Sequence, residues 1–191
     1  HANRLVGCRL GAVRYFDIDY ERDVRAAGHE GPRRIESNGE WRRPFWRYDG
    51  LDSVDFAVEI STTDDRTFTV TWEPLGFQEG IGIREVAALG YACAEDSPVA
   101  VWDVTRRGRW HPYLRRDITR VTLHYLPWDE PEAAWCPRIS LGIGTSTIEL
   151  LLADADPSGA LRPSADNVAV LFPPTPLPDW WAGTSEGAAP T

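Results

Sequence analysis

Residues 58–74 read VEISTTDDRTFTVTWEP, and this stretch decides the fold class. Apolar residues alternate with polar ones on both sides of the central aspartate pair, Val58 and Ile60 before it, and Phe68, Val70 and Trp72 after it. A period of two with one apolar set is the pattern of a strand that buries one face. The stretch therefore predicts a strand, a turn and a second strand.

The same alternation recurs along the chain, at residues 54–60, 121–125, 139–143, 148–152 and 168–172. Glycine, proline and aspartate separate the short strands, as is typical of antiparallel sheets. Helical periodicity is almost absent, and its best candidate is residues 83–89. We predict an all-β fold, mainly an antiparallel sandwich or barrel with little helix.

An N-terminal strand is expected at residues 13–20. Its even positions are apolar, with Phe16 and Ile18, whereas its odd positions include Asp17 and Asp19. We therefore expect Phe16 and Ile18 to face the core. Two carboxylates at positions i and i+2 can hold a hard cation, or they can belong to a solvated sheet face. The solvated face is the interpretation that we favour, because no further ligand is identifiable.

The second half of the chain resembles the first. Residues 138–154, RISLGIGTSTIELLLAD, repeat the strand-turn-strand pattern of residues 58–74. One explanation is an internal duplication of a four-strand unit, with pseudo-repeats 1–92 and 93–182. The other is that two β-hairpins look alike at this level of detail. Either way we expect a single compact β domain at residues 1–182 and a disordered tail at residues 183–191.

Composition excludes several classes of function. The chain has 191 residues and a net charge of −9, and every one of its 20 basic residues is an arginine. Without lysine there is no Schiff base and no P-loop lysine. Arginine pairs occur at 33–34, 42–43, 106–107 and 115–116, each with acidic residues nearby. We expect no nucleic-acid partner and no membrane partner, because both need a segregated basic face.

No run of apolar residues approaches the ~20 needed to span a bilayer, and the N-terminal stretch lacks the features of a signal peptide. The three cysteines, Cys8, Cys93 and Cys136, are widely spaced and form no CxxC motif. They are typical of reduced, mostly buried thiols rather than of a disulfide framework. Both observations favour a cytoplasmic protein.

Motifs for cofactors and catalysis are missing from the sequence. There is no H-E-x-x-H or G-x-S-x-G motif, and no glycine-rich loop opens a long helix. We expect no metal, haem, flavin or nucleotide cofactor. A histidine such as His111 or His124 can serve as a general base, but nothing in the spacing requires it.

Nine tryptophans are the strongest signal for binding. Tryptophan and arginine are enriched at binding hot spots. Several tryptophans lie in or beside predicted loops, and one of them precedes a histidine; the candidate ligand- or partner-binding residues are Trp41, Trp46, Trp110, His111 and Trp128. We expect at least two of these four tryptophans to be partly exposed around one patch or cavity mouth. The alternative is that they cover the ends of the sheets.

Residues 101–125 contain a W-x-P-hydrophobic stretch and an I-T-x-V strand, and residues 165–172 read ADNVAVLF. These motifs resemble those of uncharacterised bacterial β-rich proteins. The resemblance covers under half of the chain. It implies a compact β-rich protein and carries no activity, substrate or site residue.

The C-terminal region should contain the final strand, with Val168, Val170 and Phe172 facing the core. Pro173 and Pro174 should end it, because proline cannot donate to a sheet ladder. An extended segment then leads to Trp180 and Trp181, one of which we expect to close an end of the β structure. The competing interpretation is docking into a second chain, in a homodimer or a partner complex.

Two function hypotheses follow. The first is a non-catalytic bacterial binding or interaction protein with a protein partner, such as a toxin-neutralising immunity protein. The alternative is a small-molecule-binding β-barrel or an enzyme of secondary metabolism. A filled interior with an exposed acidic or aromatic patch favours the first, and a deep cavity lined by tryptophan and tyrosine favours the second.

Overall fold

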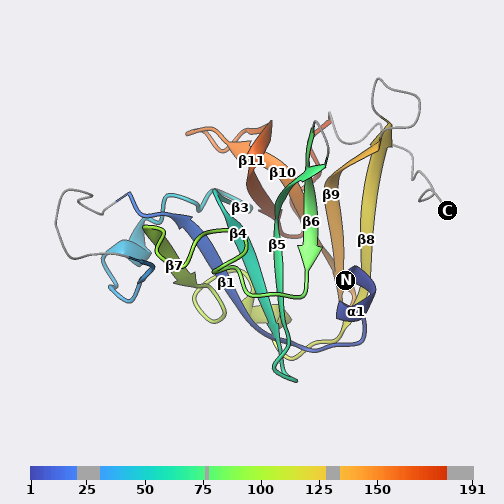
Figure 1. The fold of residues 1–191 in the computed structure, drawn as a ribbon, viewed down its shortest axis with the longest axis horizontal. Helices are drawn as coiled ribbons and strands as arrows, with labels where there is room; N and C mark the ends of the chain where they lie inside the picture. The colour runs from blue at the N-terminus through green and yellow to red at the C-terminus, as the bar shows by residue number, and fades with distance from the viewer. Residues whose placement is uncertain (21–30, 76–77, 128–133, 180–191) are drawn as a thin grey trace.

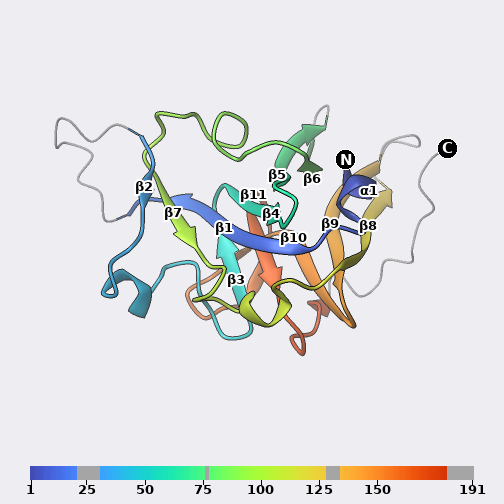
Figure 2. The same ribbon diagram turned by 90° about the horizontal axis from the view of Figure 1, so that it is seen from below.

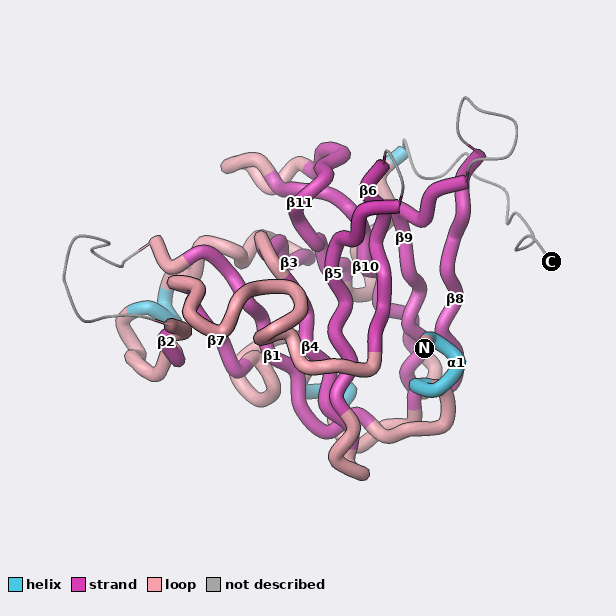
Figure 3. The backbone as a smooth tube through the Cα atoms, in the orientation of Figure 1, coloured by secondary structure: helices cyan, strands magenta, loops and turns pink. Residues whose placement is uncertain are grey.

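The computed structural model describes residues 1–20, 31–75, 78–127 and 134–179 (Figure 1). Strands make up 54% and helical turns 7% of it, and the strands form two mostly antiparallel sheets. The all-β prediction is confirmed, and Figure 3 shows how little helix the chain contains. The alternating apolar residues quoted above produce this result, because each strand buries one face.

The first sheet has six strands in the order β2-β7-β1-β4-β5-β6. Neighbours are antiparallel except for β2 and β7, which run parallel. The strands are β1 (Leu10–Ile18), β2 (Arg33–Arg34), β4 (Ala57–Thr62), β5 (Thr67–Leu75), β6 (Gln78–Arg84) and β7 (Val99–Asp103). The quoted hairpin is the β4–β5 pair, as predicted.

The second sheet has five antiparallel strands in the order β3-β11-β10-β9-β8. They are β3 (Leu51–Val54), β8 (Ile118–Pro127), β9 (Ala134–Ile143), β10 (Ser146–Ala155) and β11 (Leu161–Leu171). The helical elements are a short α1 (Ala2–Leu5), which lies beside β8, and two 3-10 turns, η1 (Glu40–Arg42) and η2 (His111–Tyr113) (Figures 1 and 2).

The main core fills the space between the two sheets, so the fold is a sandwich. The six-stranded sheet contributes Val13, Tyr15, Val58, Ile60, Phe68, Val70, Ile81 and Trp102, and the five-stranded sheet contributes Val54, Ile139, Leu141, Ile148, Leu150, Val168 and Val170. All of these side chains are 0–5% exposed. Their burial is the main stabilising contribution to the fold.

The helix candidate at residues 83–89 is wrong. Ile83 and Arg84 are the end of β6, and Ile83 is buried in the main core. The residues that follow form bends over the outer face of the six-stranded sheet, where Ala88 and Cys93 cover Phe16. Pairing with β5 therefore outweighed the weak helical periodicity of this short segment.

The two four-strand units compared in the sequence have the same order in space, β1-β4-β5-β6 and β8-β9-β10-β11. Their limits differ from the predicted repeats, because β3 joins the sheet of the second unit and β7 joins the sheet of the first. A duplication gives this order, and so do two independent antiparallel meanders, so the duplication stays a prediction.

The facing of β1 differs from the expectation. The strand has a β-bulge between Leu10 and Ala12, where it pairs with β4. A bulge inserts one extra residue and exchanges the two faces of the strand beyond it. Tyr15 and Asp17 therefore point inward, at 0% and 4% exposure, whereas Ile18 is 41% exposed. The solvated acidic face expected for Asp17 and Asp19 is wrong, since both are buried.

The last strand agrees with the sequence. Val168, Val170 and Phe172 lie in the main core. The ladder ends at Leu171, and Pro173 and Pro174 form a turn after it. Trp180, Trp181 and the tail at residues 183–191 lie outside the described residues, so their predicted roles stay predictions.

The bulge leads to the first testable prediction. A Cβ atom on Gly11 would lie 2.9 Å from the carbonyl carbon of Thr62 and 3.1 Å from the oxygen of Ser61. Gly11→Ala should therefore lower the free energy of unfolding by about 1–3 kcal/mol in chemical denaturation. Gly39→Ala is the control, because Gly39 has a helical φ of −64° and an added Cβ would meet only Ser37 Oγ, at an ordinary contact distance of 3.4 Å. A Gly11→Ala protein as stable as this control would contradict the packing described at the bulge.

Candidate functional site

A groove of about 660 Å³ lies where β1, β7 and the segment after β2 meet. We call it the Trp41 groove. It is lined by Ala12, Arg14, Arg34, Ile35, Glu36, Trp41, Val101, Asp103, Thr105, Arg106 and Arg107. Its volume is in the range of sites for small ligands. In Figures 1 and 2 these strands form the end of the six-stranded sheet that lies away from β6.

Trp41 is held in the groove by contacts on its buried side. Its Nε1–H donates to the backbone oxygen of Ile35 (3.2 Å). Its ring makes edge-on contacts with Trp46 and Trp102, at centroid distances of 6.1 and 5.1 Å. Trp41 itself is only half-buried. A large aromatic ring is thus fixed by its own core while part of it faces the groove.

The turn η1 that carries Trp41 is anchored by Arg33. This guanidinium donates to both carboxylate oxygens of Asp19 (2.7 and 2.6 Å) and to Glu40 (2.7 Å). Because neighbouring residues of a strand point to opposite faces, Arg33 points toward the buried Asp19 and Arg34 points into the groove. Of the arginine pair at 33–34, the first residue therefore stabilises the turn, and the second lines the groove.

A tight turn places Arg106 and Arg107 at the rim. The N–H of Gly108 donates to the oxygen of Val104 (3.1 Å), and a Cβ on Gly108 would lie 2.9 Å from that oxygen. The Thr105 hydroxyl exchanges hydrogen bonds with the backbone of Val13 on β1 (3.0 and 3.2 Å). These contacts fix the backbone from which the two arginines project.

Positive charge dominates the groove, with four arginines against Glu36 and Asp103. Arg14 is paired with Glu59 at 3.0 Å. The guanidinium of Arg107 lies 5.4 Å from the centroid of Trp41, within the range of a cation–π contact. A cationic, aromatic groove on a chain of net charge −9 is suited to bind an anionic or aromatic group.

Two of the predicted site tryptophans are core residues. Trp46 is 1% exposed and Trp110 is 0% exposed, so neither is one of the partly exposed tryptophans that we expected. The expectation that at least two of the four are partly exposed stays a prediction, because it now depends on Trp128, which lies outside the described residues. Trp46 lies behind Trp41, and Trp110 donates its Nε1–H to the hydroxyl of Tyr15 (2.7 Å). The loops that carry them fold over the end of the sheets, which was the alternative interpretation.

The remaining predicted residues are separated. His111 is exposed at the start of η2 and does not line the Trp41 groove. Trp128 lies outside the described residues. Of the proposed set, the structure therefore places Trp41 in a groove and Trp46 beside it. A binding role for Trp41 and for His111 stays a prediction.

The arginines of the groove were missed as site residues. Their signal was visible as the pairs at 33–34 and 106–107, but each pair had acidic neighbours in the sequence. The parallel pairing of β2 with β7, which sets Arg34 opposite Val101, is what brings them together. A contact between segments so far apart in the chain leaves no local pattern.

A second polar cluster lies at the end of β1. Asp17 Oδ1 accepts hydrogen bonds from the backbone N–H groups of Ile18 (3.0 Å) and Asp55 (3.2 Å). The Asp55 carboxylate accepts from Tyr20 (3.1 Å) and Asn167 (2.6 Å). Burial, together with the hydrogen-bonded carboxyl of Asp55, raises the pKa of Asp17 to about 8. Asp17 is therefore mostly protonated at neutral pH.

A third cluster lies on the five-stranded sheet. The Ser140 hydroxyl donates to Glu149 (2.6 Å), and its oxygen lies 2.7 Å from His124 Nε2. Arg138 lies 2.8 Å from His124 Nδ1. A nucleophilic serine needs its proton directed at the histidine, with an acid behind the ring. Here the hydroxyl donates to the carboxylate and a cation contacts the ring, so the arrangement differs from that of a serine–histidine–acid triad.

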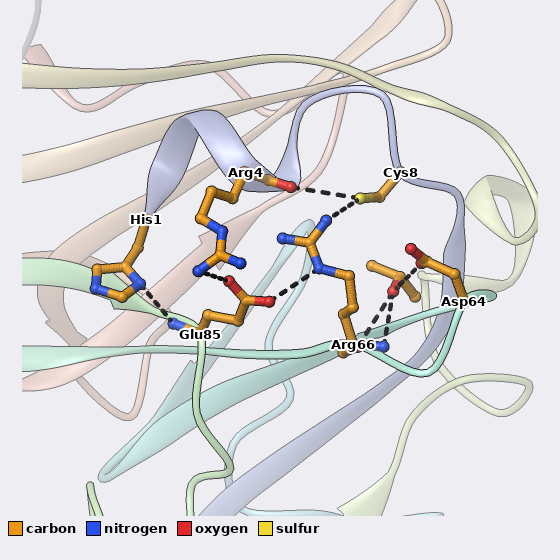
Figure 4. Close-up of polar contacts among 7 residues, drawn as sticks. His1, Arg4, Cys8, Asp64, Arg66 and Glu85 are labelled. Carbon is orange, nitrogen blue, oxygen red and sulfur yellow. Dashed lines mark hydrogen bonds and ion pairs between the residues drawn. The ribbon is translucent and has the colours of Figure 1, made fainter.

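Figure 4 shows a fourth cluster, which ties the N-terminal segment to the residues just before β5 and just after β6. Glu85 forms ion pairs with Arg4 (2.8 Å) and Arg66 (2.9 Å), and Arg66 also donates to the sulfur of Cys8 (3.1 Å). One carboxylate thus bridges a guanidinium of the N-terminal segment and a guanidinium next to β5. The cluster is therefore a structural clamp on the N-terminal segment.

The other two cysteines are buried. Burial raises the pKa of both Cys93 and Cys136 to about 11, so both are neutral thiols at neutral pH. Across residues 1–20, 31–75, 78–127 and 134–179, no group of three or more histidine, cysteine, aspartate or glutamate side chains is arranged to hold a metal ion. No helix in those ranges is both long enough and apolar enough to cross a membrane.

Comparison with known proteins yields no relative, because no family model, curated protein or solved structure matches the chain. This result is consistent with the resemblance to an uncharacterised family. The main support for a function therefore comes from the geometry and chemistry of the Trp41 groove.

The Asp17–Asp55 pair leads to a prediction about pH. Folded Asp17 keeps its proton up to pH about 8, whereas an unfolded aspartate releases it near pH ~4. The folded state binds more protons between these values, so stability falls as pH rises through this window. Asp17→Asn cannot lose a proton, and should raise the melting temperature by about 5 °C above pH 8 and by nothing near pH 4.

Thermal denaturation across that pH range measures this difference. Asp166→Asn, at an exposed aspartate, is the control and should show the pH profile of the unmodified protein. An Asp17→Asn gain that is the same at every pH would show that Asp17 does not hold a proton at neutral pH.

Proposed function

We propose that the chain is a non-catalytic binding protein that engages a protein partner through the Trp41 groove. The observation that carries this proposal is the groove itself, where a half-buried tryptophan and four arginines converge on an acidic chain. Tryptophan and arginine are the side chains that most often dominate binding energy.

The filled interior supports this proposal over an internal ligand chamber. The side chains that face each other between the sheets leave no exposed surface of tryptophan or tyrosine there; Tyr15, Trp46 and Trp110 are 0–1% exposed. A barrel that encloses a ligand needs an open interior. The burial of these rings supports a ligand site on the outer surface of the described residues over one between the sheets.

The polar clusters outside the groove also favour binding over catalysis. The Asp17 carboxyl is buried and hydrogen-bonded, and the Ser140 hydroxyl donates its hydrogen bond to Glu149 while Arg138 contacts the His124 ring. We propose a cytoplasmic location on the grounds of the neutral, buried thiols of Cys93 and Cys136. We propose neither nucleic acid nor a membrane as a partner, because a chain of net charge −9 is repelled by their anionic surfaces.

The test is capture of partners from extracts of the source organism on immobilised protein. Trp41→Ala should weaken retention of the specific partner about 30-fold, which is the ~2 kcal/mol expected of a hot-spot residue. Arg107→Ala, which leaves the packing of Trp41 on Trp46 and Trp102 in place, should also weaken it. The melting temperature of each variant shows whether it is folded.

Arg162→Ala is the matched control, because Arg162 is 74% exposed and does not line the groove. A partner that is retained equally by Arg162→Ala, Trp41→Ala and Arg107→Ala would place the binding site elsewhere. Turnover of a captured small molecule would reject the non-catalytic part of the proposal.

A further inference from the structure

We infer that the Trp41 groove binds a single compact anionic group, a phosphate or a carboxylate. Arg34, Arg106 and Arg107 are its contact residues, and Trp41 is a positioning residue that acts through Arg107. This inference rests on the proposed function, since it specifies what the groove recognises.

The first argument is that these guanidiniums are free to bind. Within the described part of the chain, Arg34 and Arg106 make no side-chain hydrogen bond or ion pair. Arg107 has one long contact, 3.4 Å to the side-chain oxygen of Asn38. By contrast, Arg14 already pairs with Glu59. Three of the four arginines in the groove therefore keep their donors available, although acidic residues outnumber basic ones in the chain.

The second argument is preorganisation. Arg107 lies over the ring of Trp41, and Arg47 lies over the same ring at 5.8 Å. A guanidinium held near a fixed ring by a cation–π contact loses less conformational freedom when it binds, because its position is already restricted. Its parallel N–H groups match the two oxygens of a carboxylate or phosphate. Trp41 thus sets the direction in which Arg107 presents its donors.

The third argument concerns the size of the anion. Glu36 and Asp103 also line the groove and offset part of the charge of its four arginines, and they repel further negative groups around the one that is bound. The volume of about 660 Å³ holds a small ligand or a short piece of chain. These features favour one anionic group over a polyanion.

The experiment is an NMR titration of the full chain with arginine side chains labelled with ¹⁵N. Phenyl phosphate stands for a small-molecule source of the anion, and an acetylated and amidated Gly-Glu-Gly peptide, which carries one carboxylate, stands for a protein source. We expect saturable shifts of the Nε–H signals of Arg34, Arg106 and Arg107 at millimolar concentrations of at least one probe. Added salt should weaken the binding, because ions screen exposed charges.

Variants separate the contact role from the positioning role. Arg106→Gln and Arg107→Gln should each weaken binding of the probe about tenfold. Trp41→Leu should weaken it too, but the double variant Trp41→Leu/Arg107→Gln should bind no more weakly than Arg107→Gln alone. Additive losses would contradict positioning through Arg107, since a merely structural role for Trp41 predicts them. Arg162→Gln is the matched control and should bind as the unmodified protein does.

The inference is overturned if no groove arginine signal shifts with either probe, or if Arg162→Gln weakens binding as much as Arg107→Gln does. Its failure is distinguishable from failure of the proposed function. A partner that is lost in Trp41→Ala while neither probe binds would leave the groove as the binding site and reject an anionic ligand. If the groove binds a probe but Trp41→Ala retains the partner unchanged, the anionic ligand is supported and the groove is rejected as the partner's binding site.

Discussion

The buried carboxylate of Asp52 is the constraint around which the molecule is arranged. Asp52 lies on β3 of the five-stranded sheet and is 0% exposed. It accepts a hydrogen bond from the hydroxyl of Tyr15 (2.9 Å), which comes from the six-stranded sheet, and it is paired with Arg109. Burial raises the pKa of Asp52 to about 6, against the opposing effect of Arg109. A buried charge is tolerated only when it is paired, so Asp52 holds both sheets and the loop that carries Arg109 in one arrangement.

A series of contacts between aromatic side chains extends from Tyr15, the partner of Asp52, toward the surface. Tyr15 contacts Trp46 edge-on at 5.0 Å and accepts a hydrogen bond from Trp110, which in turn lies 5.3 Å from Phe172. Trp46 then contacts Trp41. Of the six tryptophans among the described residues, four are therefore connected in this way, and these are Trp41, Trp46, Trp102 and Trp110. Trp41 is the member of this series that meets the groove. Binding through Trp41 thus depends on a ring that the core has already fixed.

The fold class could be predicted from the sequence because apolar residues recur at every second position in a strand that buries one face. The sequence was not sufficient for the facing of β1, because the bulge at Gly11 exchanges the two faces and looks like any other glycine in a strand. That single residue places Asp17 and Asp19 inside, where Asp19 anchors Arg33.

The site was only half predictable for a related reason. Trp41 was identified from its chemistry, whereas Trp46 and Trp110 have the same local surroundings in the sequence and differ only in which tertiary contacts bury them. The arginine pairs were visible, but the pairing of β2 with β7 that unites Arg34 with Arg106 is a long-range contact. Sequence patterns report local periodicity well and contacts of this kind poorly.

A double-mutant cycle on Asp52 and Arg109 tests the central claim most directly. Asp52→Asn leaves a partly buried guanidinium without its carboxylate, and Arg109→Met leaves a buried carboxylate without its cation, so each should lower the free energy of unfolding by about 3 kcal/mol or more. The account predicts that the double variant loses less than the sum of the two, with a coupling of at least about 2 kcal/mol. Losses that add to within about 0.5 kcal/mol would show that the two groups stabilise the protein independently, and would contradict the account.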